Sequence, residues 1–387
     1  MDTGTAYGRP APTYRRELTE VGAGTPMGEL LRRYWHPVAL SSDDLSVPRQ
    51  KTILGETLIA FRDGKGRPGL VYPRCAHRGA SLYYGKVEER GIRCCYHGWL
   101  FDVQGRCLEQ PCEEGGGARR DNVRQPWYPL EERYGLVFAY LGPPGKKPVL
   151  PRYDCLEELA PGEFIEADDS SIGSGGPQIV DCNWLQHWEN VVDPFHVPIL
   201  HGSFSGAQFV AQMAAMPKVT FSPTPRGVKV ESLRPAEGGR THRRVTEVVM
   251  PTLRVVPNPR VAKFGKVESI GWVLPIDDTH FRIYTAGRVT EKGELSKFRS
   301  RMAGKAWYEL TPEEHQRHPG DYEAQTSQGA ITFHSEERLA TSDKGIAQLR
   351  RFLEQQLKTV AGGGDPACVA FNDKDAYVRL DAGQDLV

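Results

Sequence analysis

The apolar pattern near the N-terminus predicts a short helix. Apolar residues recur at helical spacing over 27–34, directly after Thr25 and Pro26. This pair is typical of a helix start, because the Thr hydroxyl can cap free N–H groups and Pro is tolerated at the first helical position. We expect Pro37 to end the helix, since Pro cannot continue it. The polar, Gly- and Pro-rich residues 1–24 are expected to form a loose arm.

From about residue 50 to residue 145 the pattern is typical of β-structure. The stretch LIAFRDGKGRPGLVY predicts a hairpin that turns at Asp63–Gly66, and GLVFAYLGPPG predicts a buried strand followed by a loop. Apolar and polar residues alternate again over 217–290, with frequent Pro and Gly, as in an antiparallel sheet. The Pro-rich residues 146–165 are expected to link two parts of the chain.

Two further segments have helical character. WLQHWENVV is one of them. TSDKGIAQLRRFLEQQLKTV is the other, with apolar residues at helical spacing, Ser342 or Asp343 as a cap, and Gly362 as a stop. No internal repeat is visible. The sequence therefore predicts an α+β chain of two main parts.

Composition narrows the class of protein. The 387 residues contain 49 Lys plus Arg and 49 Asp plus Glu, so the balanced charge favours neither nucleic-acid nor membrane binding. No apolar run approaches the roughly 18 residues that suggest a membrane span. The first residues have no apolar core of the kind a secretory signal needs. We expect a cytoplasmic protein, whose eight cysteines are free thiols or metal ligands rather than disulfides.

Two Cys-His pairs carry the first chemical signal. Cys75 stands two residues before His77, and Cys94 stands three residues before His97. A Rieske [2Fe–2S] cluster needs two Cys on one iron and two His on the other, and two short loops can supply them in this way. A glycine follows each loop and allows a tight turn. A structural zinc site is the alternative, although zinc fingers usually pair Cys with Cys and His with His.

A second group of residues is compatible with a mononuclear iron. His196 and His201 stand five apart, Asp193 precedes His196 by three, and Asn190 precedes Asp193 by three. Two imidazoles and one carboxylate form the facial triad of non-haem Fe(II) oxygenases. Two core histidines are the alternative, but a one-electron cluster nearby needs an electron acceptor. His187 is a possible extra ligand, and spacing alone does not choose the carboxylate among 49 acids.

Together these motifs resemble a known family. Cys75-Ala-His77-Arg-Gly and Cys94-Cys-Tyr-His97-Gly-Trp, followed by Asn183-Trp-Leu-Gln and the Asp193-x2-His196-x4-His201 run, resemble the oxygenase (alpha) component of Rieske non-haem iron oxygenases. Within it, the chain resembles the phthalate 4,5-dioxygenase group, which includes O-demethylases such as 5,5'-dehydrodivanillate O-demethylase. The resemblance covers most of the chain.

The resemblance implies a third iron ligand and a fold. The stretch Asp321-x5-Ser327-x-Gly329 matches a late pattern of that branch, which makes Asp321 the ligand, with Glu323 and Asp373 as fallbacks. The family often has Trp-Glu at 325–326, where this chain has Gln-Thr. The implied fold is an arm and helix over 1–34, an all-β Rieske [2Fe–2S] domain over 35–150, and a helix-grip catalytic domain over 151–387 with an antiparallel sheet and a C-terminal helix.

The resemblance also implies an assembly. Members of this branch resemble homotrimers in which the Rieske cluster of one chain reduces the mononuclear Fe(II) of the next. Asp193 then bridges His97 of the partner subunit and His196 of its own chain, and we expect Asp193 and Asn190 to serve catalysis. A helix cap is the alternative role for Asp193, because Pro194 follows it.

The expected function is that of a terminal oxygenase acting on an aromatic acid and O2. NAD(P)H electrons would arrive through a flavin reductase, with or without a ferredoxin, because the chain has no Gly-rich dinucleotide motif of its own. O-demethylation of a methoxylated lignin-type acid such as 5,5'-dehydrodivanillate is favoured over cis-dihydroxylation of a phthalate-type acid. A Rieske electron carrier without oxygenase activity is a distant alternative. An Arg or Lys should pair the substrate carboxylate.

Overall fold

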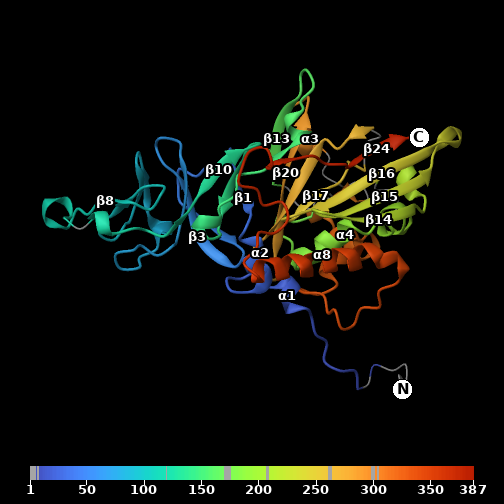
Figure 1. Cartoon of the computed structure of the whole chain (residues 1–387), viewed down its shortest axis with the longest axis horizontal. Helices are drawn as coiled ribbons and strands as arrows, with labels where there is room; N and C mark the ends of the chain where they lie inside the picture. The colour runs from blue at the N-terminus through green and yellow to red at the C-terminus, as the bar shows by residue number, and fades with distance from the viewer. Residues whose placement is uncertain are drawn as a thin grey trace.

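The computed structural model of the chain describes residues 6, 8–118, 120–169, 176–205, 209–259, 264–297, 301–302 and 305–387. A narrow β-rich part extends from one side of a broader part that is built on a large sheet (Figure 1). This is the predicted α+β arrangement. No helix within the described residues is long and apolar enough to cross a membrane.

The helix predicted near the N-terminus is present but shorter than expected. It is α2 (Pro26–Leu31), preceded by α1 (Arg16–Thr19), and Thr25 Oγ1 accepts its capping hydrogen bond from the Gly28 N–H at 3.1 Å. The expectation that Pro37 ends it was wrong. Pro37 lies inside strand β1 (Trp35–Leu40), which is tolerated because β1 is the edge strand of its sheet and the register shifts next to Pro37.

Two four-stranded antiparallel sheets form most of the narrow part. The predicted hairpin is confirmed, since Gly66 donates to the Asp63 carbonyl at 2.8 Å between β3 and β4. The first sheet contains β2 (Arg49–Ile53), β3 (Glu56–Arg62), β4 (Pro68–Val71) and β9 (Trp127–Tyr128). The second contains β5 (Lys86–Glu88), β6 (Gly91–Arg93), β7 (Leu100–Phe101) and β8 (Cys107–Glu109).

Short 3-10 turns and a third sheet complete this part. The turns are η1 (Leu82–Tyr84), η2 (Glu114–Gly116), η3 (Arg120–Asn122) and η4 (Pro144–Lys146). The third sheet pairs β1 with β11 (Leu136–Tyr140), and β11 with β10 (Leu130–Arg133). All five residues of β11 are buried, as the sequence predicts for GLVFAYLGPPG.

A nine-stranded antiparallel sheet is the frame of the broader part. Its main path runs in the order β13-β20-β19-β17-β16-β15-β14, and β24 and β18 join it beside β16. The strands are β13 (Phe164–Asp168), β14 (Lys218–Thr224), β15 (Gly227–Pro235), β16 (Thr241–Val249), β17 (Leu253–Val255), β18 (Gly265–Lys266), β19 (Ser269–Pro275), β20 (Phe281–Val289) and β24 (Gly383–Leu386).

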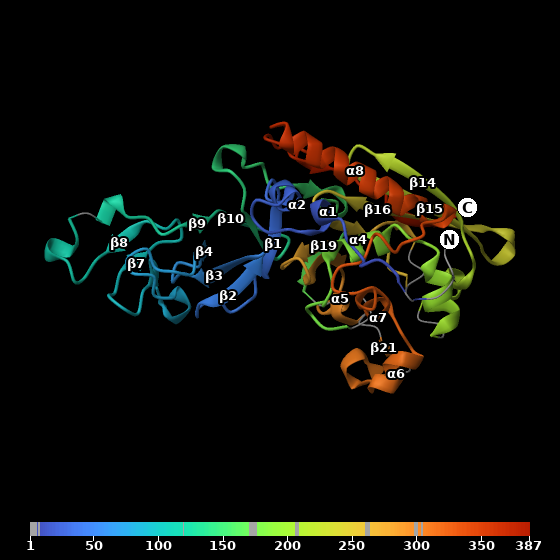
Figure 2. The same ribbon diagram turned by 90° about the horizontal axis from the view of Figure 1, so that it is seen from below.

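Two helices pack against this sheet and against each other. They are α4 (Trp184–Val191) and α8 (Lys344–Ala361), and α8 crosses the molecule near β14 and β15 (Figure 2). Asp343 occupies the N-cap position of α8. Its carboxylate does not cap the helix but accepts a hydrogen bond from the Ala340 N–H at 2.7 Å. The helix ends before Gly362, as predicted.

The remaining elements are short. They are β12 (Arg152–Tyr153), α3 (Asp154–Glu157), the π-helix η5 (Val197–Phe204), η6 (Ala211–Ala214), η7 (Glu237–Gly239), α5 (Glu294–Lys297), β21 (Arg301–Met302), β22 (Lys305–Ala306), η8 (Trp307–Glu309), α6 (Pro312–Arg317), α7 (Asp321–Thr326), η9 (Thr341–Asp343) and β23 (Tyr377–Val378). The stretch 146–165 is more than a linker, because β12 pairs in parallel with β23 near the C-terminus.

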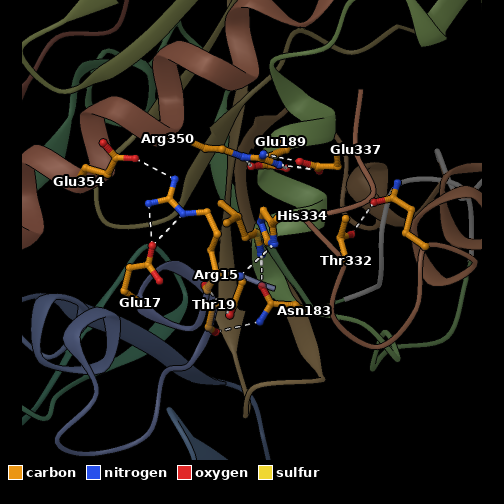
Figure 3. A network of polar contacts seen from close by, with 12 residues as sticks. Arg15, Glu17, Thr19, Asn183, Glu189, Thr332, His334, Glu337, Arg350 and Glu354 are labelled. Carbon is orange, nitrogen blue, oxygen red and sulfur yellow. Dashed lines mark hydrogen bonds and ion pairs between the residues drawn. The ribbon is translucent and has the colours of Figure 1, made fainter. Parts of the chain in front are cut away.

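A buried arginine fixes α4 to α8. The Arg350 guanidinium forms a bidentate pair with Glu189 of α4, at 2.6 and 2.8 Å, and also contacts both carboxylate oxygens of Glu337, at 2.5 and 2.8 Å (Figure 3). Burial raises the pKa of Glu189, although the hydrogen bond from Arg350 opposes this effect. Helix α4, helix α8 and the loop that contains Glu337 are therefore joined by one largely desolvated network of charges.

The N-terminal arm is tied to the same region rather than loose. Thr13 and Ser335 exchange hydrogen bonds at 2.8 and 3.1 Å, and the Arg15 N–H donates to Nδ1 of His334 at 3.2 Å. Arg15 also contacts Glu354 of α8 (Figure 3). Residues 1–5 and 7 of the predicted arm lie outside the described residues.

Replacing Arg350 by Met should destabilise the protein by about 3–5 kcal/mol, because the variant leaves Glu189 buried without a cation. Urea unfolding followed by tryptophan fluorescence would measure the loss. Arg351→Met is the matched control, since Arg351 is the exposed neighbour on the same helix. Equal free energies of unfolding for the two variants would contradict the stabilising role proposed for this network.

Candidate metal centres

Two equivalent loops present the predicted cysteine and histidine ligands. One follows β4 and the other connects β6 to β7. In each loop a cysteine N–H donates to a carbonyl five residues later, from Cys75 to Ala80 and from Cys94 to Trp99, both at 2.9 Å. Gly79 and Gly98 have φ of +75° and +71°, a backbone conformation that favours glycine. The predicted need for glycine in these turns is therefore met.

The four side chains of these loops fit a [2Fe–2S] cluster. Cys75 and Cys94 are both buried and lie side by side, close enough to interact through their thiols. The imidazole rings of His77 and His97 lie beside each other, with ring centroids 4.6 Å apart. Two adjacent thiols and two adjacent imidazoles are the donors that a Rieske cluster needs, one pair for each iron.

Burial controls the protonation of these ligands. It raises the pKa of the Cys75 thiol to about 11, and the neighbouring Cys94 adds to this effect. It lowers the pKa of His77, and His97 lowers it further. The imidazole of His77 is thus neutral and ready to bind a metal, whereas the thiol requires a cation to displace its proton.

A second site lies where α4 meets η5. The Asn183 side chain caps α4 by accepting from the Leu185 N–H at 3.0 Å, and the chain then turns into the π-helix, with His196 at its N-cap and His201 within it. A π-helix bonds residue i to residue i+5, so residues five apart lie close to one another along its surface. This explains how a His-x4-His spacing brings two rings together, with centroids 5.4 Å apart.

Asp321 completes this cluster from a distant part of the chain. It is the first residue of α7, and its Oδ1 lies 3.1 Å from Nε2 of His201 and 3.6 Å from Nε2 of His196. Ligand atoms about 2.1 Å from one ion lie about 3 Å from each other, so these separations suit a metal. One ligand atom from each of the three residues lies within 4.8 Å of the others.

The electrostatics of this cluster also suit a cation. Burial alone would raise the pKa of Asp321, but His201 and then His196 lower it far below its usual range. The carboxyl is therefore ionised in the folded protein. Two imidazoles and one carboxylate with nitrogen and oxygen donors fit a non-haem iron.

Asn190 and Asp193 border the cluster. Asn190 Nδ2 donates to Asp321 Oδ1 at 3.3 Å and lies 3.5 Å from Nε2 of His196. Asp193 Oδ1 accepts from the Phe195 N–H at 2.8 Å, while Oδ2 lies 3.5 Å from Nδ1 of His196. The carboxylate thus faces the ring nitrogen that points away from Asp321. About 29% of the Asp193 side chain is exposed, which leaves it accessible.

The other candidate ligands lie outside the three-residue cluster, although His187 lines the same cavity. His187 is buried, and its Nδ1 is paired with Oε1 of Gln325 at 3.1 Å, outside the three-residue cluster. Glu323 caps α7 through the Gly320 N–H at 2.8 Å. Asp373 lines a surface depression with basic residues. Among the three carboxylates considered, only Asp321 lies beside the two histidines.

A cavity of about 220 Å³ opens beside the three-residue cluster. The inner face of the large sheet forms much of its wall and contributes Arg234, Arg244 and Arg254, one from each of three consecutive strands. Sequence reasoning missed these arginines. Their signal is a basic residue at an inward position of an alternating strand, which can be recognised only once the inward face is known.

Comparison with known proteins agrees with this arrangement. A family model for the Rieske [2Fe-2S] domain matches residues 34–128. The phenoxybenzoate dioxygenase subunit alpha of Ectopseudomonas oleovorans is 52% identical over 98% of this chain and 93% of its own length. The 5,5'-dehydrodivanillate O-demethylase oxygenase subunit of a Sphingobium species is 32% identical over 91% and 82%, respectively.

Solved structures share the fold at low identity. Pseudomonas putida CBB5 NdmA with caffeine superposes with a TM-score of 0.64 and 19% identity, over 88% of this chain and 94% of that one. Dicamba monooxygenase bound to dicamba gives a TM-score of 0.60 and 17% identity, over 86% and 99%. The all-β Rieske domain, the antiparallel catalytic sheet, both metal centres and the relatives at 52% and 32% identity converge on one conclusion. The chain belongs to the Rieske non-haem iron oxygenases and is an oxygenase (alpha) component that carries a Rieske [2Fe–2S] cluster and a mononuclear iron.

Proposed function

We propose that this oxygenase cleaves the ether bond of an aromatic acid by oxygenating it, with a phenoxybenzoate-type acid as the first candidate substrate. The observation that carries the proposal is that His196, His201 and Asp321 line the same cavity as the inner face of the sheet, so metal and organic substrate share one space. The relative at 52% identity supports the phenoxybenzoate class. O-demethylation of a methoxylated acid such as 5,5'-dehydrodivanillate is the second candidate, supported by the relative at 32%.

Both reactions break an aryl ether and have the same electron demand. In dioxygenation, O2, two electrons and two protons add two hydroxyl groups to neighbouring ring carbons. If one of these carbons carries the ether oxygen, the product is a hemiacetal that expels a phenol and regains its aromatic ring. In O-demethylation, the same inputs hydroxylate the methoxy carbon and form water, and the hemiacetal then releases formaldehyde. Iron supplies the oxygen chemistry, while the protein positions and shields the reactants.

We propose the following ligand assignment. Cys75 and Cys94 bind one iron of the cluster and His77 and His97 bind the other, while the histidine pair and Asp321 hold the mononuclear Fe(II). Asn190 orients the Asp321 carboxylate through their 3.3 Å hydrogen bond. We propose that Asp193, whose Oδ2 lies 3.5 Å from Nδ1 of His196, orients this ring in the holoenzyme. Such outer partners fix the orientation of ligand rings.

Electrons reach the oxygenase from a separate donor, as the family requires. We propose a flavin reductase, with or without a ferredoxin, as that donor and NAD(P)H as the source. We further propose a homotrimer in which Asp193 also accepts a hydrogen bond from His97 of the partner subunit. The functional units are proposed as 35–150 for the Rieske domain and 151–387 for the catalytic domain.

Product analysis tests the proposed reaction. With a reductase and NADH, the holoenzyme should consume O2 with a phenoxybenzoate and release phenol. Mass spectrometry would measure the released phenol, and O2 uptake would measure the oxygen consumed. Stoichiometric formaldehyde from a methoxylated acid, with no turnover of phenoxybenzoate, would favour O-demethylation instead. A stable cis-diol from a phthalate, without ether cleavage, would contradict both ether reactions.

The substitution Asp193→Asn should leave reduction of the cluster unchanged but slow the transfer of its electron to the mononuclear iron. The variant keeps the side-chain volume but loses the charge that faces His196, so both metal centres should stay loaded and the cluster should still accept an electron. Reoxidation of the reduced cluster by O2 and substrate should slow at least about tenfold, the typical cost of losing such an outer partner. Stopped-flow absorbance would measure it. Normal reoxidation would leave Asp193 with a capping role only.

A further inference from the structure

The inner face of the large sheet changes from apolar to cationic along two neighbouring strands. On β15 the inward positions Val228 and Val230 pack in the core, whereas Ser232 and Arg234 line the cavity. On β16, Arg244 and Thr246 line it in the same way. The cavity therefore has a basic wall at one place on the sheet.

The register places Arg234 and Arg244 next to each other. Arg244 faces Ser232 across the strands and Arg234 faces His242, so the two arginines are diagonal neighbours on one face of the sheet. Such neighbours are about 7–8 Å apart between Cα atoms. Two long side chains at this distance can direct their guanidinium groups at one ligand.

In the described part of the chain, neutral groups hold these guanidinium groups. Arg234 Nε donates to the Ala215 carbonyl at 3.1 Å, and its buried Nη1 has no hydrogen-bond partner among the described residues. Arg244 Nη1 donates to Oε1 of Gln384 at 3.2 Å, and Nη2 donates to the Pro257 carbonyl. Both arginines are at least 95% buried. These hydrogen bonds fix the positions of the two guanidinium groups, and no described carboxylate neutralises their charges.

No carboxylate in the described part of the chain forms an ion pair with either arginine. Burial lowers the pKa of Arg234 to about 10 and that of Arg244 to about 9, which is the expected response of a cation without a counter-ion. Glu268 opposes this effect on Arg244 only from a distance. Asp168 is an acid of the sheet that lines the cavity, and it lies on β13 at the far end of the strand order. A buried cation pair of this kind favours an anionic ligand.

Arg254 lies closer to the iron site. Burial lowers the pKa of Arg254, and the negative charge of Asp321 opposes this effect. Its strand partner is Val248, four residues from Arg244 along β16. At a rise of about 3.3 Å per residue this corresponds to about 13 Å of strand. The wall thus has one cation that is influenced by the Asp321 carboxylate, and a pair of cations whose backbone positions lie further along the sheet.

We propose that Arg234 and Arg244 together bind the carboxylate of the aromatic acid and hold its reacting ring toward His196, His201 and Asp321. This inference rests on the proposed function and assigns the substrate carboxylate to one pair among 49 basic residues. The planar donor forks of arginine match a carboxylate, and two forks fix its orientation as well as its charge. The separation along β16 favours an acid whose carboxylate and reacting carbon are far apart, as in a two-ring ether.

Binding to the oxidised holoenzyme tests the site without turnover. Isothermal titration calorimetry would compare a phenoxybenzoate with its neutral amide, in the wild type and in Arg234→Met and Arg244→Met. Each variant should lose roughly 10- to 100-fold in affinity for the acid, the range for a charge-assisted hydrogen bond, and little for the amide. Arg234→Lys and Arg244→Lys should recover part of the loss, because they restore charge without the fork.

Arg243→Met is the matched control. Arg243 is adjacent on β16 but points to the opposite face, where it pairs with Glu231, so its loss should not change the affinity for either compound. The Rieske absorption spectrum and the iron content of each variant should match the wild type, which shows that it folds. Unchanged affinity for the acid, or equal losses for acid and amide, would overturn the arginine assignment and leave the proposed function intact. A wild type that binds neither compound would contradict the proposed function itself.

Discussion

The catalytic half of this protein depends on one partly buried carboxylate, that of Asp321, which faces two imidazoles. Asp321 begins α7, and the two histidines belong to a segment more than a hundred residues earlier. A desolvated carboxylate is costly unless positive charge compensates it, and the imidazoles alone can do so only by holding protons. A metal cation in place of these protons would compensate the carboxylate charge and bind both imidazoles. The relative placement of α4, η5 and α7 is therefore a condition of function, and the rest of the fold serves to fix it.

Several contacts meet this condition from outside the site. Arg350 binds Glu189 of α4, so the helix that leads into the histidine segment is fixed to α8. Glu323 caps the helix that begins with Asp321. The large sheet closes the cavity on the other side and brings Arg234 and Arg244 into its wall. One cavity therefore contains a carboxylate beside the two histidines and, on the sheet, the arginine pair proposed to bind the substrate acid.

How much could be predicted from the sequence follows from the separation of the residues involved. The Cys75/His77 and Cys94/His97 pairs are short-range motifs on turns, so spacing alone exposes them. Asp321 came only from family resemblance, because spacing does not relate residues that meet through tertiary structure. The arginine pair could not be found, since it depends on strand register and on which face is inward. Pro37 was misassigned because the apolar spacing extends the predicted helix to residue 34, whereas α2 ends at Leu31 and Pro37 lies in an edge strand.

The central claim is that His196, His201 and Asp321 bind the catalytic iron, separately from the cluster between the two Cys-His loops. Anomalous diffraction at the iron edge, from crystals of the holoprotein, tests it most directly. We expect one peak between these three side chains, and a second, two-iron feature between Cys75, Cys94, His77 and His97. Iron bound to another carboxylate, or no peak beside Asp321 in protein that is fully active, would contradict it.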